Sequence, residues 1–166
     1  MALRTIRIAG DPVLEKTCRE VKEITPRLRE LIADMFETMY EGSGVGLAAP
    51  QVGILRRAAV VDVTEDHSGL LEMVNPEIIE REGEQTGREG CLSVPGRQGI
   101  VTRPMKIKAR FQDKNGDSYE LETEGFEARA ICHELDHLDG TLYIDIMERE
   151  LTEEEIQGHI PEDGEQ

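Results

Sequence analysis

The chain of 166 residues has few cysteines and no long apolar run. Its three cysteines are an odd number, and its N-terminus lacks the charged, apolar and small-residue order of a secretion signal. The sequence therefore predicts a reducing, cytoplasmic location rather than secretion. No apolar run approaches the roughly 20 residues that a membrane span requires, so we expect no contact with a membrane.

Basic residues are also scarce. Lys and Arg together number 19 against 35 Asp and Glu, which gives a formal net charge of −16. Proteins that bind nucleic acid without sequence preference depend on basic patches, so this balance argues against direct nucleic-acid binding. An acidic surface mainly favours solubility and says little about the fold.

The length and the apolar pattern predict a single α+β domain without internal repeats. Thr25 and Pro26 have the form of a helix start, and Gly42 should end that helix. Its apolar residues recur at helical spacing: Leu28, Leu31, Ile32, Met35, Phe36 and Met39.

Strand patterns follow, and a second helix comes after them. The predicted strands are 57–63, 70–79, 105–111 and 118–121, with a hairpin turn at 113–116, and the second helix covers about 126–138. We expect small antiparallel or mixed sheets packed around this second, central helix. A short helix should also start at Asp11, and another at the capping box that opens with Thr152, before a polar, frayed tail at 158–166.

The central helix carries the sequence H-E-x-x-H at His133, Glu134 and His137. Residues four apart on a helix lie about 40° apart around the axis and about 6 Å apart along it, so both imidazoles can reach one metal ion. Glu134 is then placed to move a proton on a water molecule at that ion. The alternative is a solvated helix face with two surface histidines.

A catalytic metal usually has three protein ligands and one open position, so a third ligand is required. The metzincin continuation of the motif is followed as far as Gly140, but Tyr143 stands where that family has its third His. Cys132 projects about 100° away from His133, off the face with the imidazoles. Cys18 has no candidate ligand near it in the sequence.

Cys91 is the better candidate, because glycines and a proline bracket it in Glu89-Gly-Cys-Leu-Ser-Val-Pro-Gly96 and allow close approach of the backbone. On this pattern alone a ligand and a small core residue are equally good readings. The segment from Gly44 to Gly53 is too rich in glycine for a helix and predicts a close-packed loop or short strand. Its one polar side chain, Gln51, has an amide that could donate to a developing oxyanion.

Three segments together, Gly44-Val-Gly-Leu-Ala-Ala-Pro-Gln51, Glu89-Gly-Cys-Leu-Ser93 and His133-Glu-Leu-Asp-His137, closely resemble the three motifs of the peptide deformylase family. The resemblance spans nearly the whole chain. It implies a metal-dependent hydrolase that removes the formyl group from the N-terminal formyl-methionine of new polypeptides and releases formate.

The resemblance also implies a role for each matching residue. Cys91, His133 and His137 would be the metal ligands and Glu134 the general acid and base. The oxyanion donors would be the Gln51 side chain and the backbone N–H of Leu92, and the backbone of Gly46 would lie along the substrate. The metal would be ferrous iron in cells, with zinc, nickel or cobalt as alternatives in isolated protein.

Two helix residues share the face of the ligands, because Phe126, Ala130, His133 and His137 follow one another at spacings of four, three and four. They are candidate walls of a pocket for the methionine side chain, and core packing is an equally good reading. The chain differs from many relatives in having Cys132 where Gln is common and Arg129 where an apolar residue is common. Glu89 and Arg103 could form a supporting ion pair, although a solvated Arg is nearly as good a reading.

The resemblance predicts a catalytic domain at 1–150 and a short acidic extension at 151–166. Relatives that dock on the ribosome do so with a basic C-terminal helix, and this chain has acidic residues there. Its partners would be formyl-methionine N-termini, with at most a transient ribosome contact through another surface, and the protein would act as a monomer. Two alternatives are a metallopeptidase, which shares H-E-x-x-H, and an inactive metal-binding scaffold.

Overall fold

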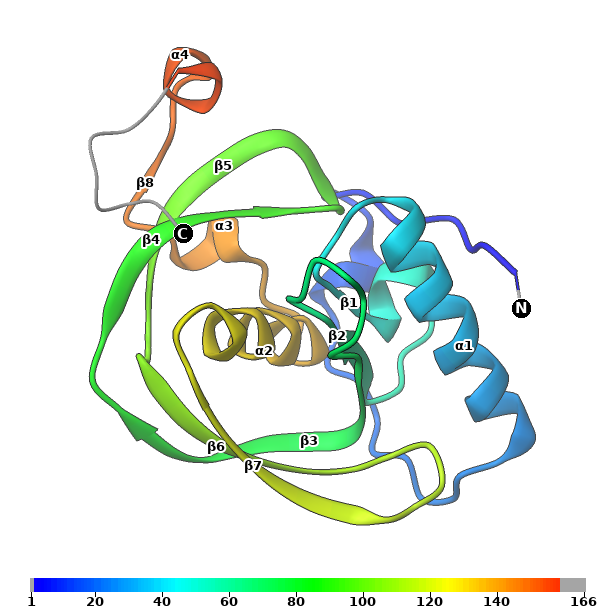
Figure 1. Ribbon diagram of the computed structural model, residues 1–166. Coiled ribbons are helices and arrows are strands. Elements are labelled where there is room, and N and C mark those ends of the chain that lie inside the picture. Colours follow the sequence, from blue (N-terminus) through cyan, green and yellow to red (C-terminus); the bar gives the residue numbers. More distant parts are fainter. Residues whose placement is uncertain (1, 159–166) are drawn as a thin grey trace.

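The computed structural model describes residues 2–158, which form two antiparallel sheets around a buried helix. The first sheet has the order β1-β2-β3-β6-β7 and the second has the order β4-β5-β8. Figure 1 shows the helix α2 (Gly125–Leu138) enclosed by these strands, with α1 (Pro26–Glu41) on the outside beside β1 and β2. The strands are β1 (Gly46–Ala48), β2 (Ala58–Val61), β3 (Leu71–Glu82), β4 (Gln85–Cys91), β5 (Val94–Arg103), β6 (Lys106–Gln112), β7 (Ser118–Glu124) and β8 (Arg149–Glu150). The predicted α+β class is confirmed.

The helix α1 forms as its caps and apolar stripe predict. The Thr25 side chain accepts a hydrogen bond from the backbone N–H of Leu28, and the backbone N–H of Gly42 closes the last turn. Five residues of the predicted stripe are buried and Phe36 is half-buried: Leu28, Leu31, Ile32, Met35 and Met39. They pack on β1 and β2, and this cluster supports the segment that begins at Gly46.

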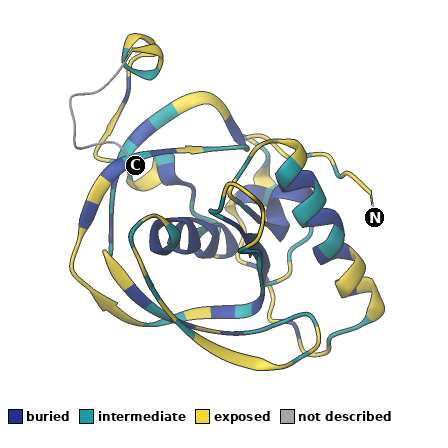
Figure 2. Ribbon diagram, viewed as in Figure 1, coloured by how far each residue is buried: buried dark blue, intermediate teal, exposed yellow. Residues whose placement is uncertain are grey.

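The helix α2 is buried along most of its length, as its dark colour in Figure 2 shows. From Ala128 to Leu138 every residue except Asp136 is buried. Gly125 and Gly140 bound the helix at positive φ angles of 68° and 81°, which are easily adopted only by glycine. A buried helix with an Arg, a Glu and two His is costly unless these groups have partners, so its polar residues indicate a functional site.

The short elements complete this frame. Asp11 caps a 3-10 turn η1 (Pro12–Glu15), and the glycine-rich segment contains β1 and a second 3-10 turn, η2 (Ala49–Val52). Thr152 caps α4 (Glu153–Gln157) with the predicted capping box, and α3 (Tyr143–Ile146) precedes β8. The predicted tail lies outside the described residues from 159 onward. Within the described part, no helix has both the length and the apolar character to cross a membrane.

Several strand features differ from the prediction. The strands β4 and β5 were not predicted, because four glycines interrupt their apolar pattern and lower their strand propensity. Their pairing nevertheless runs from Gln85 opposite Arg103 to Cys91 opposite Val94. The strands β3 and β7 each extend three residues beyond the predicted end, to Glu82 and Glu124, and the two-residue β8 was not predicted. The missed hairpin is the element that brings Cys91 to α2.

Candidate metal centre

Three side chains that are far apart in the sequence converge beside α2. The strand β4 ends at Cys91, and α2 presents His133 and His137 one turn apart. One ligand atom from each of the three lies within 4.8 Å of the others, and the Cys91 Sγ is 3.3 Å from the His137 Nε2. A thiolate and two imidazoles form a donor set that suits a divalent transition metal, so these residues fit one ion.

The other candidate side chains for a ligand do not join this group. Cys18 and Cys132 are buried in the apolar core, and burial raises the pKa of each thiol to about 11. Tyr143, at the metzincin position, stacks on the His133 ring with centroids 6.0 Å apart. Its side chain fixes the ring by packing. The structure therefore brings together Cys91, His133 and His137 as the resemblance implied.

Glu89 lies buried behind His133. Its Oε1 is 2.9 Å from the His133 Nδ1, which leaves the Nε2 of that ring facing the ligand group. Although burial opposes ionisation, hydrogen bonds from Arg103 and His133 hold the pKa of Glu89 well below its usual range. An ionised carboxylate on Nδ1 orients the ring and increases the basicity of its other nitrogen.

Two buried arginines hold Glu89 in turn. Arg103 donates from Nε and Nη2 to both carboxylate oxygens, at 2.8 and 2.9 Å, and Arg129 donates from Nη1 at 2.7 Å. Arg103 also donates to Asp136 on α2 at 2.6 Å. Of the two readings of Glu89 and Arg103, the ion pair is the one observed. The sequence did not predict that Arg129 belongs to this network, because nothing around Arg129 indicates a contact with Glu89, 40 positions away.

Glu89→Gln should weaken both folding and metal binding. The change removes the negative charge from between two buried arginines, and breaking a buried ion pair costs about 3 kcal/mol of unfolding free energy. Loss of such a partner of a ligating His typically lowers metal affinity about 10- to 100-fold. Urea unfolding of metal-free protein and chelator competition measure the two effects.

The matched control is Glu120→Gln, which removes the same charge from an exposed pair with Arg110 at 3.3 Å. An exposed pair contributes at most about 1 kcal/mol, so this variant should retain stability and metal affinity. A Glu89→Gln protein that unfolds and holds metal like the wild type would contradict the role of this network.

Glu134 lies between the ligand group and β1. It is only 4% exposed, burial raises its pKa to about 7, and its Oε1 has no hydrogen-bond partner among the described residues. A carboxyl group with such a pKa can both accept and return a proton near neutral pH. Gly46 on β1 faces it so closely that an added Cβ would lie 2.4 Å from the Glu134 Oε2. The glycine therefore makes the space that Glu134 occupies.

Gln51 reaches the ligand group from η2. Its Oε1 accepts the backbone N–H of Ala48 at 2.9 Å, which orients the amide, and its Nε2 donates to the Ser93 Oγ at 3.0 Å. The same Nε2 is 3.5 Å from the Cys91 Sγ, and the backbone N–H of Ser93 is 3.4 Å from that sulfur. Ser93 is fully buried and was missed as a site residue, although it lies in one of the three motifs. Leu92 lies in the tight turn between Cys91 and Ser93.

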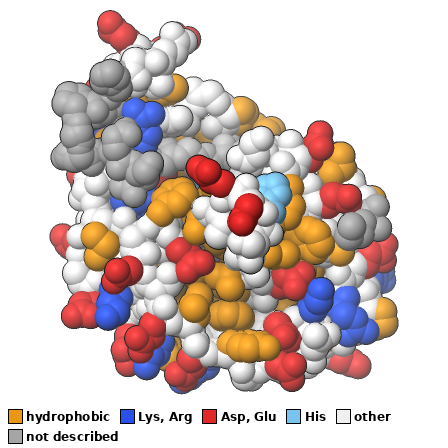
Figure 3. Space-filling model, in the orientation of Figure 1, with side chains coloured by type: hydrophobic (Ala, Val, Ile, Leu, Met, Phe, Trp, Pro, Cys, Tyr) orange, Lys and Arg blue, Asp and Glu red, His pale blue; other side chains and the backbone are white. Residues whose placement is uncertain are grey.

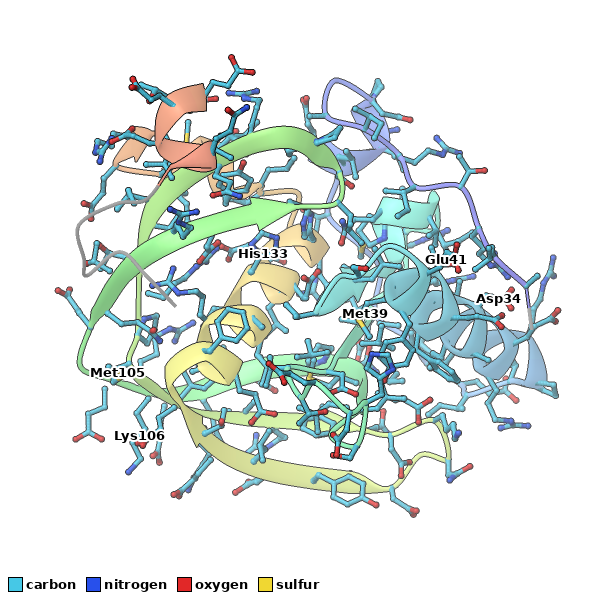
Figure 4. All side chains as sticks on the ribbon, turned by 45° about the horizontal axis from the view of Figure 1, so that its top comes forward. Asp34, Met39, Glu41, Met105, Lys106 and His133 are labelled. Carbon is cyan, nitrogen blue, oxygen red and sulfur yellow. The ribbon has the colours of Figure 1, made fainter. Side chains whose placement is uncertain are left out.

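A cavity of about 560 Å³ opens on this group. Figure 4 shows His133 on α2, beneath the β4–β5 hairpin. The predicted residues Gly46, Leu92, Phe126 and Ala130 all line the cavity, together with His133, Glu134 and Cys91. Phe126 is 39% exposed and Ala130 is buried, so the apolar part of the wall runs from the surface into the interior. A larger groove, about 960 Å³, lies near the start of α1 and contains none of these residues.

Comparison with known proteins identifies the family of the chain and agrees with its fold. The sequence model described as "Polypeptide deformylase" matches residues 3–153. The peptide deformylase of Agathobacter rectalis is 64% identical over 148 residues, which are 89% of this chain and 92% of that protein. The peptide deformylase of Caldanaerobacter subterraneus subsp. tengcongensis is 54% identical over 158 residues, which are 95% of this chain and 98% of that protein.

Solved structures give the same result. The crystal structure of peptide deformylase from Thermotoga maritima has a TM-score of 0.85 and 42% identity, covering 89% of this chain and 99% of that one. A peptide deformylase from Synechococcus elongatus, solved in complex with actinonin, has a TM-score of 0.82 and 39% identity, covering 87% of this chain and 78% of that one. The chain therefore belongs to the polypeptide deformylase family, the hydrolases that remove the N-formyl group from new polypeptides.

Proposed function

We propose that this chain hydrolyses the formyl amide of N-terminal formyl-methionine with one divalent metal ion held by Cys91, His133 and His137. The observation that supports this most directly is the convergence of these three side chains, of which Cys91 and His133 line one cavity together with Glu134. One bound metal ion supplies an activated water molecule at neutral pH. We propose ferrous iron in cells, with zinc, nickel or cobalt in isolated protein, because the mixed thiolate and imidazole set accepts each of these metals.

Glu134 is the proton carrier in this proposal. It takes the proton of the attacking water and passes it to the departing amine, so the same carboxyl group acts first as base and then as acid. Its buried position and its pKa of about 7 support both roles. The absence of any hydrogen-bond partner for Oε1 among the described residues leaves that oxygen available to the reaction.

The developing oxyanion receives hydrogen bonds from the Gln51 Nε2 and the backbone N–H of Leu92. Because Ala48 fixes the Gln51 carbonyl, the amide N–H₂ is held toward Cys91 and Ser93 before substrate arrives. Donors that need no reorganisation stabilise a developing charge most effectively.

The substrate would place its methionine side chain against Phe126 and Ala130 and its backbone along Gly46, which all line the cavity. We assign this activity to residues 1–150 and treat 151–166 as an acidic extension. The protein would act as a monomer in the cytoplasm on nascent formyl-methionine N-termini. The three free cysteines and a thiolate ligand fit a reducing compartment.

Formate release tests the proposal. Protein purified without oxygen, stripped with a chelator and reloaded with ferrous iron should release formate from a formyl-Met tripeptide, whereas the stripped protein should match the blank. Acetyl-Met and unblocked peptides of the same sequence are the controls. Cleavage of internal peptide bonds without formate would favour a metallopeptidase, and no reaction by folded, metal-loaded protein would overturn the proposal.

A further inference from the structure

The charges around the cavity differ from those of the rest of the chain. The net charge is −16, and acidic side chains are spread over the face shown in Figure 3. The cavity, in contrast, is lined by Arg88, Arg97 and Arg129, with Glu89 and Glu134 as its acidic residues. Basic side chains therefore outnumber acidic ones in the lining of this cavity, although the protein as a whole is acidic.

Two of the three arginines have charged partners within the fold. Arg129 is 1% exposed and donates to Glu89. Arg97 donates two hydrogen bonds to Glu150 at 2.7 and 2.8 Å. Their positive charges are therefore compensated before any substrate binds.

Arg88 has no such partner. Its Nη1 donates to the neutral Gln98 Oε1 at 3.1 Å, its Nε is buried without an acceptor, and it forms no ion pair within the described part of the chain. The side chain is half-buried, so its charge is partly shielded from water. A half-buried guanidinium that faces a cavity and has no acidic partner in the protein can form an ion pair with an acidic group of a ligand.

The position of Arg88 suits the residues that follow formyl-methionine. Arg88 precedes Cys91 by three residues on β4, a separation of about 10 Å along an extended strand. The two residues that follow the methionine of a substrate span about 7 Å, which is shorter than the separation of Arg88 from Cys91. The long arginine side chain can reach across the remaining distance. The acidic remainder of the protein has little effect at this site, because charges more than about 8 Å away are screened at physiological salt.

We propose that Arg88 is a specificity-determining residue that favours nascent chains with acidic side chains at the second and third positions. The inference rests on the proposed function, since it concerns the substrate of the same site. An ion pair at a half-exposed position should strengthen the binding of an acidic peptide about three- to fivefold. This preference should decrease at high salt, because salt screens the two charges.

The test compares three amidated peptides, so that no terminal carboxylate contributes: formyl-Met-Asp-Asp, formyl-Met-Ala-Ala and formyl-Met-Lys-Lys. For wild-type protein, kcat/KM should decrease in that order, mainly through KM, and the order should weaken at 0.5 M salt, which is well above the ~0.15 M physiological level. Arg88→Gln retains a polar partner for Gln98 and should remove the preference while it leaves formate release from the Ala peptide within about twofold.

The matched control is Lys106→Gln, which removes the same charge from β6, far from His133 (Figure 4). This variant should retain the wild-type preference. Equal rates for the Asp and Lys peptides, or a preference that survives in Arg88→Gln, would overturn the inference while formate release still supports the proposed function. Absence of formate from all three peptides would instead reject the proposed function.

Discussion

Glu134→Gln should lower kcat for formate release about a hundredfold to ten-thousandfold, which is the range for loss of a general acid and base. The amide cannot take the water proton or return it to the amine, while it preserves the size of the side chain beside Gly46. Steady-state kinetics of iron-loaded wild type and variant with a formyl-Met tripeptide measure the effect. KM should change little, because this group acts on the reacting bond rather than on the methionine side chain.

A structural role for Glu134 would give a different result. The wild-type carboxylate is desolvated and lacks a partner for Oε1 among the described residues, so its loss should leave the Tm of metal-free protein equal to or above that of wild type. Metal content after reconstitution should remain at one ion per chain. The control is Glu127→Gln on the same helix, which should retain full activity because Glu127 does not line the cavity. A Glu134→Gln enzyme within tenfold of wild type would exclude Glu134 as the proton carrier.

Local sequence rules predicted the parts of the site that lie on one helix. The spacing of His133 and His137 is sufficient to place both imidazoles on one face, because helix geometry repeats every 3.6 residues. The caps at Thr25 and Gly42 gave the bounds of α1 in the same way. Such rules act over a few residues and need no information about the rest of the fold.

The long-range parts of the site could not be derived from local rules. The sequence around Cys91 alone fits a core residue as well as a metal ligand, and only the three motifs together favour the ligand. Local sequence could not decide this, because the approach of Cys91 to His137 depends on the pairing of β4 with β5. The position of Arg129 on Glu89 likewise depends on packing α2 against that hairpin. Glycine-rich strands lack the side-chain pattern by which strands are recognised, and their pairing is decided by the tertiary contacts around them.

The contact between Gly46 and Glu134 is another such long-range feature, and it leads to the second large expected effect. Gly46→Ala should reduce kcat at least about a hundredfold, because the new Cβ would lie 2.4 Å from the Glu134 Oε2 and 2.9 Å from its Cγ and Cδ. The backbone of Gly46 is not in the left-handed region, so the cost arises from the collision rather than from the chain conformation. Forcing this carboxyl group aside should also cost about 1 to 3 kcal/mol of unfolding free energy, as overpacking does elsewhere.

A double variant separates this collision from any other effect of the added methyl group. Glu134→Ala removes all three atoms that the Cβ of Ala at position 46 would meet most closely. In that background Gly46→Ala should therefore be nearly neutral, whereas in the wild-type background it destabilises. Urea unfolding of the four proteins of this cycle gives the coupling, expected at about 1 to 3 kcal/mol for groups in direct contact. An equal loss of stability in both backgrounds would show that Gly46 is required by other neighbours, and full activity of Gly46→Ala would show that Glu134 does not need the position in which it lies.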